Sequence, residues 1–204
     1  MNKKVVIIDY GMGNVASVKK AFDKLGAEAL ISADQTEINA ATHIVLPGVG
    51  AFPEGIKNLK QNGLVQILNQ KVLKEKTPFL GICLGMQLIA EKGFEFGAHD
   101  GLGWIKGEVK KINVNELRLP HVGWDNIETD KDEQMFQGVT DFNFYFVHSF
   151  HLDCKKKDIV SSTCHYGEEF TASLRKGNIW ATQFHPEKSQ VSGLRLLENF
   201  LKYA

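Results

Sequence analysis

The first half of the chain alternates short apolar runs with amphipathic segments, and this alternation constrains the fold more than any other feature. Strands that helices cover on both faces read as continuous apolar runs, because neither face meets water. The runs of this kind span residues 5–9, 29–32, 43–48 and 79–83. Between them, apolar residues recur at helical spacing across 15–25 and, less regularly, across 56–72. The pattern predicts βαβ units and a doubly wound sheet.

The second half carries strand patterns with little helix between them. These patterns cover residues 103–112, 142–150, 158–166, 170–175 and 178–184. Residues 176–178, Lys-Gly-Asn, predict a hairpin turn between the last two, and residues 192–204 return to a helical pattern. We therefore predict a single domain over 1–204 of the α/β class. Its flavodoxin-like sheet is mixed, mostly parallel and flanked by helices, with an antiparallel strand extension in the second half.

Charge and composition favour no polyanionic partner. The chain of 204 residues carries 24 basic and 24 acidic side chains. The basic stretch 154–158 lacks interleaved aromatic residues, so a solvated turn is its default interpretation. The first apolar run stops at Asp9, too early for a signal peptide or a membrane span. Three unevenly spaced cysteines predict reduced thiols. We expect a cytoplasmic protein with neither a nucleic-acid nor a membrane partner.

Cys83 lies between two glycines where a predicted strand gives way to a helical pattern. Gly81 and Gly85 stand two residues on either side of it. A nucleophile elbow needs this spacing, because a sharp strand-to-helix turn leaves no room for side chains beside the reactive one. The helix predicted over 84–92 would point its positive dipole end at Cys83 and favour the thiolate, and the Leu84 N–H would face a developing oxyanion. A lone cysteine is more often a buried apolar residue, but the flanking glycines favour catalysis.

A thiolate nucleophile needs an acid/base partner, and His185 is the candidate that stands out. It follows the predicted strand 178–184, and Glu187 lies two residues further on, so that in an extended segment both side chains project to the same side. Glu187 would then orient the imidazole. A strand-end histidine and a solvated glutamate are the alternatives, and spacing alone does not exclude them.

Four motifs together resemble a known family, the class I (triad) glutamine amidotransferases. They are "PGVGAF" at 47–52, "PFLGICLGMQ" at 78–87, "YFVHS" at 145–149 and "QFHPEKSQ" at 183–190. The resemblance extends from "IDYGMGN" at 8–14 to "LLENF" at 196–200, nearly the whole chain. Within the family, the sequence is most similar to the branch of glutaminase subunits of imidazole glycerol phosphate synthase from histidine biosynthesis.

The resemblance implies a catalytic triad of Cys83, His185 and Glu187. Cys83 attacks the side-chain amide of L-glutamine, His185 protonates the departing ammonia, and water frees glutamate from the thioester. The oxyanion hole is implied for backbone groups of Val49, Gly50 and Leu84. The substrate-binding positions are implied to be Gly48, Gln87, Glu95, His148 and Ser149. No cofactor and no metal ion are expected.

The resemblance also implies a second chain. Similar proteins form a heterodimer with a (β/α)8-barrel cyclase, which takes up the ammonia, converts the ribonucleotide PRFAR into imidazole glycerol phosphate and releases AICAR. Asn14, Trp124 and Lys188 match positions at or near the docking face. In such pairs the glutaminase activity is low until the partner holds its ligand, in keeping with a flexible "PGVG" segment.

Other functions are consistent with parts of the sequence. Asp125 stands where the commonest form of the family has Asn, and paralogous glutaminases that supply ammonia to sugar-aminating synthases are very similar to this chain. Residues 11–16 fit the G-x-G-x-x-A pattern of dinucleotide-binding oxidoreductases, beginning at Gly11, with Asp34 near the ribose-binding position. That interpretation leaves Cys83 and "FHPEKS" unused.

Two further alternatives concern metal binding and loss of activity. His151, Cys154, Cys164 and His165 have side chains that suit zinc, but neighbouring residues of a strand point apart. Packing residues on antiparallel strands are the simpler interpretation. A noncatalytic paralogue would have a broken triad, whereas all three triad residues are present here.

Overall fold

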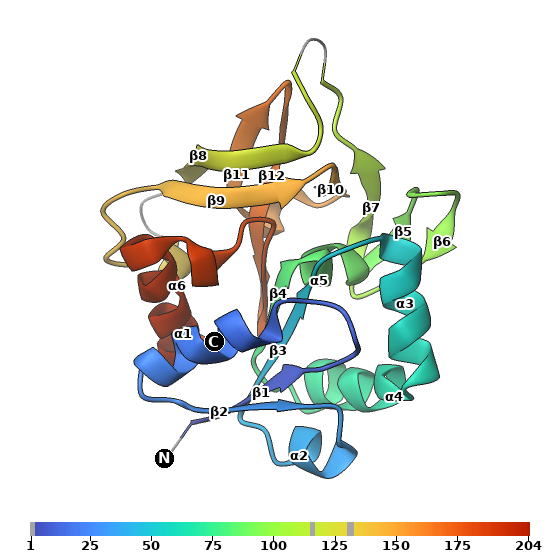
Figure 1. Ribbon diagram of the computed structural model, residues 1–204, viewed down its shortest axis with the longest axis vertical. Helices are drawn as coiled ribbons and strands as arrows, with labels where there is room; N and C mark the ends of the chain where they lie inside the picture. Colours follow the sequence, from blue (N-terminus) through green and yellow to red (C-terminus); the bar gives the residue numbers. More distant parts are fainter. Residues whose placement is uncertain (1–2, 115–116, 130–132) are drawn as a thin grey trace.

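The apolar runs of the first half form parallel strands in a large mixed sheet (Figure 1). The computed structural model describes residues 3–114, 117–129 and 133–204. The parallel strands are β1 (Lys4–Ile8), β2 (Glu28–Ser32), β3 (His43–Gly48), β4 (Phe79–Cys83) and β13 (Ile179–Thr182). They pair in the order β2-β1-β3-β4-β13. The βαβ prediction is confirmed.

An antiparallel extension continues the same sheet beyond β13. It consists of β12 (Glu168–Lys176), β11 (Val160–Tyr166), β8 (His121–Thr129) and β9 (Asn143–His148). With these strands the sheet has nine members within the described ranges. The predicted hairpin is present, because Lys176 pairs with Ile179 across a turn in which Gly177 has a φ of 59°. Strand β8 was not predicted. Its exposed and less exposed residues alternate, but the apolar Val122 and Trp124 lie on the exposed side, so the sequence shows no matching alternation of polar and apolar residues.

A second, smaller sheet lies beside the first and was not predicted. In the part of the chain that the structure describes, it contains β10 (Phe150–Cys154), β7 (Ile105–Lys111), β5 (Ala90–Gly93) and β6 (His99–Asp100). The strand pattern over 142–150 is therefore split between two sheets. Strand β9 ends at His148 and β10 begins at Phe150, so the chain crosses from one sheet to the other at Ser149.

Helices cover both faces of the parallel strands. The α-helices are α1 (Val15–Lys24), α2 (Gln35–Asn39), α3 (Phe52–Gln61), α4 (Leu64–Leu68), α5 (Leu84–Leu88) and α6 (Gln190–Tyr203). The pattern over 56–72 is divided at Gly63, whose φ is 65°, and continues into the π-helix η1 (Asn69–Lys74). Short 3-10 helices are η2 (Gln134–Phe136), η3 (Lys157–Ile159) and η4 (Pro186–Lys188).

The helix predicted after Cys83 is shorter than expected. It ends at Leu88 instead of reaching residue 92, because Ala90–Gly93 is the strand β5 and pairs with β7. Pairing in the second sheet therefore overrides the helical pattern of this segment.

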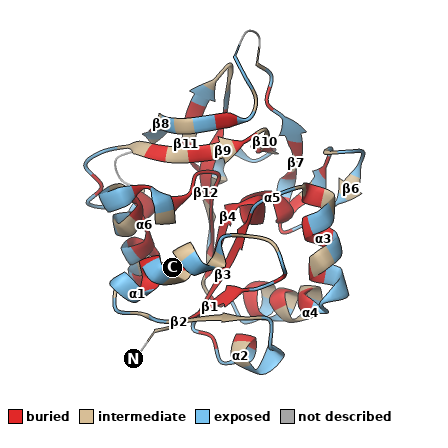
Figure 2. Ribbon diagram, in the orientation of Figure 1, coloured by how far each residue is buried: buried red, intermediate tan, exposed pale blue. Residues whose placement is uncertain are grey.

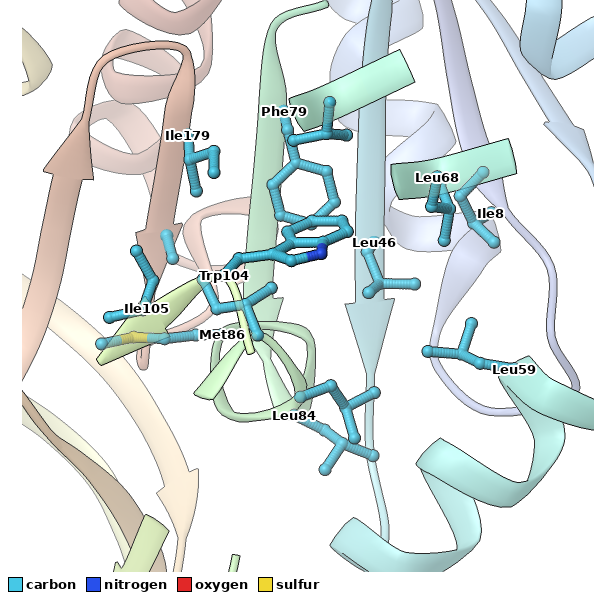
Figure 3. Packing of buried hydrophobic residues seen from close by; sticks show 14 of the residues in the cluster. Ile8, Leu46, Leu59, Leu68, Phe79, Leu84, Met86, Trp104, Ile105 and Ile179 are labelled. Atoms are coloured by element: carbon cyan, nitrogen blue, oxygen red, sulfur yellow. The ribbon is translucent and has the colours of Figure 1, made fainter. Parts of the chain in front are cut away.

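Two apolar cores lie on opposite faces of the large sheet (Figure 2). On one face, Phe22 of α1 and Phe200 of α6 pack together, with ring centroids 6.4 Å apart. On the other face, Phe79 and Trp104 pack edge to face at 5.0 Å, among residues from α3, α4 and α5 (Figure 3). Because both faces are covered, the carboxyl ends of the parallel strands are the open edge at which a site can form. Within the described ranges, no helix is long and apolar enough to cross a membrane.

Candidate active site

Cys83 lies at the carboxyl end of β4, at the junction with α5. Its backbone has φ 53° and ψ −108°, a conformation that costs energy in a residue other than glycine. The residue is 5% exposed and lines a pocket. A strained residue at a strand-to-helix turn is the geometry of a nucleophile elbow, as the glycine spacing predicted.

The glycines around Cys83 are required by close backbone contacts. A Cβ atom on Gly81 would lie 2.9 Å from the Gly85 carbonyl oxygen. One on Gly85 would lie 1.8 Å from the Leu46 carbonyl oxygen on the neighbouring strand β3. Neither position has room for a side chain, so the tight turn that presents Cys83 depends on both glycines.

His185 and Glu187 form a buried pair. His185 Nδ1 lies 2.8 Å from Glu187 Oε1, and the two side chains are 3% and 1% exposed. The segment is not extended as the sequence suggested, because Pro186–Lys188 forms the 3-10 helix η4. The contact between His185 and Glu187 therefore forms across this turn and not along an extended strand.

The protonation of His185 depends on its neighbours. Burial alone would lower the pKa of His185, but the charge of Cys83 and the bond to Glu187 raise it to about 10. The other ring nitrogen, Nε2, is buried and forms no hydrogen bond within the described residues. The surroundings therefore favour an imidazolium at His185, with Nε2 available for proton transfer.

Ser189 fixes this segment and was not singled out from the sequence. Its Oγ donates to the His185 carbonyl oxygen at 2.7 Å and accepts from the Tyr145 N–H at 3.0 Å. The His185 N–H donates in turn to the Tyr145 carbonyl oxygen at 2.9 Å. These bonds attach the histidine to β9, the strand that ends at the pocket.

The pocket beside Cys83 has a volume of about 400 Å³. Most of the predicted positions line it: Val49, Gly50, Cys83, Leu84, Gln87, Glu95, His148 and Ser149. Other lining residues were not predicted, namely Ala51, Phe96, Pro120, Val147 and Phe150. The pocket walls come from the end of β3, from α5, from the loop after β5 and from the crossing between β9 and β10.

The segment after β3 faces Cys83, since Gly48 pairs with Cys83 in the sheet register. Val49 is 41% exposed, and Gly50 has a φ of 107°. Gly48 itself does not line the pocket. It is enclosed, because a Cβ atom there would lie 2.2 Å from Tyr10 Oη. A backbone with glycines on both sides of Val49 can change its peptide orientations at low cost.

Gln87 and Gln183 form a buried amide network next to the thiol. Gln87 Nε2 donates to the Phe150 carbonyl oxygen at 2.8 Å and to Gln183 Oε1 at 3.1 Å. Gln183 Nε2 donates to Cys83 Sγ at 3.7 Å. Gln183 was not predicted, and its position next to Cys83 follows from β13 lying beside β4.

Glu95 and His148 have structural contacts of their own. Glu95 Oε2 accepts from the Phe52 N–H at 2.8 Å, at the start of α3. His148 Nδ1 lies 2.9 Å from the Phe150 carbonyl oxygen. Deep burial lowers the pKa of His148 to about 3, so this imidazole is neutral near pH 7.

Two of the three predicted docking residues share a neighbour. Trp124 is 45% exposed and packs edge to face on Tyr145 at 6.0 Å. Lys188 Nζ lies 5.5 Å from the centre of the same ring. Asn14 is exposed and caps α1, accepting from the Ser17 N–H at 3.4 Å. The structure thus places Trp124 and Lys188 against the same ring, whereas Asn14 caps the start of α1.

The glycine loop of residues 11–16 packs against the segment that leads to the pocket. A Cβ atom on Gly13 would lie 3.3 Å from Gly48 Cα, and one on Gly50 would lie 2.8 Å from Met12 Cε. This loop supports the backbone at Val49, a role that the dinucleotide interpretation does not explain.

The four residues of the zinc alternative are divided between two sheets. His151 and Cys154 lie on β10, whereas Cys164 and His165 lie on β11. Among the residues described, no three His, Cys, Asp or Glu side chains are grouped so as to hold a metal ion.

Comparisons with known proteins agree with one another. The sequence profile of the family "Glutamine amidotransferase class-I" matches residues 6–204. The imidazole glycerol phosphate synthase subunit HisH 1 of Campylobacter jejuni is 49% identical over 200 residues, which cover 97% of this chain and 99% of that protein. Subunit HisH 2 of Methanococcus maripaludis is 45% identical over 202 residues, covering 98% and 100%. A crystal structure of a glutamine amidotransferase superposes with a TM-score of 0.75 at 20% identity, covering 97% of each chain.

Proposed function

This chain belongs to the class-I glutamine amidotransferase family, and we propose that it is the glutaminase subunit of imidazole glycerol phosphate synthase in histidine biosynthesis. It hydrolyses L-glutamine to glutamate and ammonia, and the ammonia passes to a cyclase subunit that makes imidazole glycerol phosphate and AICAR from PRFAR. The observation that carries the proposal is the strained Cys83 at a pocket beside the buried pair of His185 and Glu187.

The first half of the reaction forms a thioester. The Cys83 thiolate attacks the side-chain amide carbon of glutamine, and the electron pair of the carbonyl moves to its oxygen. Backbone N–H groups of Leu84 and of the Val49–Gly50 segment stabilise this oxyanion. The carbon–nitrogen bond then breaks as His185 Nε2 gives its proton to the nitrogen, so ammonia leaves.

The second half of the reaction releases glutamate. The neutral His185 takes a proton from water, and the resulting hydroxide attacks the thioester carbon. Collapse of the second tetrahedral intermediate expels the Cys83 thiolate and frees glutamate. Glu187 holds the imidazole by its Nδ1 and stabilises the imidazolium that forms in each cycle.

The ammonia must reach its acceptor without entering bulk water, where it would be protonated and lose its nucleophilicity. We therefore assign the acceptor site to a separate (β/α)8-barrel subunit, bound one-to-one. Exposed Trp124, which shares the Tyr145 ring with Lys188, is a suitable aromatic anchor for such a partner. A cytoplasmic location remains a prediction.

Partner binding is expected to act on the segment after Gly48. Val49 is flanked by glycines and partly exposed, so its peptide can rotate to present an N–H to the oxyanion. The liganded partner would select that orientation and raise glutaminase activity.

A bypass experiment tests the division of labour. In the complex with the cyclase, Cys83→Ala should abolish product formation from glutamine and leave formation from high ammonium salt near the wild-type rate. The exposed Val191, replaced by Ala, is a matched small substitution outside the site. Glutamine-dependent turnover by Cys83→Ala close to the wild-type rate would refute the proposed nucleophile.

A further inference from the structure

A chain of three polar contacts leads from the pocket to the surface of β8. His148 Nδ1 lies 2.9 Å from the Phe150 carbonyl oxygen, and His148 Nε2 lies 3.1 Å from His121 Nδ1. His121 Nε2 then lies 3.4 Å from Asp125 Oδ2. His121 and His148 face each other across β8 and β9, which run side by side (Figure 1). Both imidazoles are buried, whereas the Asp125 side chain is 37% exposed and follows Trp124.

Aromatic side chains hold the middle imidazole in place. The His121 ring is stacked between Tyr166, with centroids 4.0 Å apart, and Phe146, with centroids 4.9 Å apart. Tyr166 is fixed in turn, since its hydroxyl donates to the Arg118 carbonyl oxygen at 2.8 Å. Faces of aromatic rings also stabilise a nearby positive charge. The site therefore fixes the orientation of His121 and tolerates its protonated form.

The three contacts need three N–H groups, and two neutral imidazoles supply only two. Carbonyl and carboxylate oxygens accept, so His148 Nδ1 and His121 Nε2 must both donate, and the contact between the rings needs one proton more. Burial lowers the pKa of His148 to about 3, so the extra proton belongs to His121. The pKa of His121 is lowered too, because burial outweighs the opposing effect of the facing Asp125, so His121 takes up this proton only as the pH falls. The contact of His121 Nε2 to Asp125 Oδ2, at 3.4 Å, is the longest of the three.

We propose that His121 is a positioning residue: it holds His148 as the Nδ1–H tautomer in the pocket and connects it to Asp125 on the face that carries Trp124. A partner that covers Asp125 changes the protonation of His121. Through His121, it also changes the position of the His148 side chain in the pocket. The proposal rests on the proposed function only where it calls the pocket a glutamine site. Other titratable groups lie close to these contacts. Tyr166 and Cys164 on β11 are near His121 and Asp125, whereas His151 on β10 and His185, just before η4, are near His148.

The first test reads the tautomer directly and needs no activity. In the full chain with ¹⁵N-labelled histidine, NMR should show His148 with a protonated Nδ1 and a hydrogen-bonded, unprotonated Nε2. His121→Phe keeps a flat ring for stacking but removes both nitrogens, so the His148 Nε2 resonance should move toward that of a free acceptor. His121→Asn returns one N–H donor and should restore part of the shift. His165→Asn, on the exposed side of β11, is the matched control and should change nothing at His148.

The second test uses glutamine hydrolysis in the complex with the liganded cyclase. His121→Phe should raise KM for glutamine roughly tenfold, the effect of one lost buried hydrogen bond, with kcat changed less than about twofold. His121→Asn should fall between His121→Phe and the wild type. If His121→Phe does not fold, the same measurements of KM and of the His148 resonances are made on His121→Asn and Asp125→Asn.

Asp125→Asn separates positioning from a merely structural role. The amide introduced at position 125 can itself donate to His121 Nε2. The three contacts then need only two N–H groups from the imidazoles, which two neutral rings supply. Protonation of His121 should make the His148 resonances and KM depend on pH in the wild type, and this dependence should disappear in the variant. Unchanged His148 resonances and KM in His121→Phe would overturn the proposal. A wild-type complex without glutaminase activity would refute the proposed function instead, while the NMR result would still decide the role of His121.

Discussion

His185 Nδ1 lies 2.8 Å from Glu187 Oε1, and neither side chain is more than 3% exposed. Replacing the carboxylate by an amide keeps the size of the side chain but removes the charge that supports the imidazolium. Glu187→Gln should therefore lower kcat for glutamine hydrolysis on the order of 10²-fold with a small effect on KM. Glu198→Gln on the exposed face of α6 is the matched control. Wild-type kcat in Glu187→Gln would remove Glu187 from the triad.

Tyr10 and Gly48 should be coupled in stability. The Tyr10 hydroxyl is buried without a hydrogen-bond partner among the described residues, and a Cβ atom on Gly48 would lie 2.2 Å from it. Gly48→Ala should cost about 1–3 kcal/mol of unfolding free energy through overpacking. Tyr10→Phe should stabilise the chain by on the order of 1 kcal/mol, because it removes an unpaired buried hydroxyl.

The double variant distinguishes this contact from a general effect of each substitution. Urea unfolding of Gly48→Ala with Tyr10→Phe should show that the second change recovers part of the loss caused by the first. Strict additivity of the two effects would mean that the hydroxyl is not what excludes a side chain at position 48.

The three cysteines should differ in reactivity. Burial raises the pKa of Cys154 to about 11 and that of Cys164 to about 12, so both remain thiols near pH 7. Cys83 lines the pocket beside an imidazolium, and a thiolate is the reactive form. Brief treatment of the native chain with a glutamine-like alkylating agent should label Cys83 alone in a peptide mass map. The unfolded chain should be labelled at all three positions, and equal labelling of Cys154 in the native chain would contradict the assignment.

Acid should destabilise the chain through His148. Its pKa is lowered to about 3 in the fold, whereas an unfolded histidine titrates near 6.5. The unfolded state therefore takes up the proton first, and stability that is present above about pH 6.5 is lost as the pH falls toward 3. Between about pH 6.5 and pH 5, the wild type should lose about 1.5 kcal/mol more than His148→Gln. Urea unfolding at both pH values measures the difference, and parallel losses would show that His148 is not the buried neutral group.

The sequence predicted those parts of the fold and site that depend on local pattern. The parallel strands are apolar along their length because helices cover both faces of the sheet. The alternation of such strands with helices could therefore be predicted from the sequence. The turn at Cys83 was predictable because it leaves no room for side chains at Gly81 and Gly85. The pairing of His185 with Glu187 was also predictable, although a 3-10 turn and not an extended strand brings them together.

The unpredicted parts depend on contacts between distant segments. Gln183 meets Gln87 across 96 positions of the sequence, and Phe150 meets Gln87 across 63. No local pattern of residue types marks such pairs. The helix after Cys83 ends early for a similar reason, because β5 pairs with β7 in a sheet that the sequence did not reveal.

The most direct test of the account is glutamine hydrolysis by the purified chain mixed with a histidine-pathway cyclase subunit, with and without its ribonucleotide ligand. We predict slow hydrolysis by the chain alone and strong stimulation by the liganded cyclase. If hydrolysis stays absent with the liganded cyclase while Cys83 is still labelled by a glutamine-like alkylating agent, the chain is a glutaminase that serves a different synthase. That result would contradict the assignment to histidine biosynthesis and favour a sugar-aminating partner.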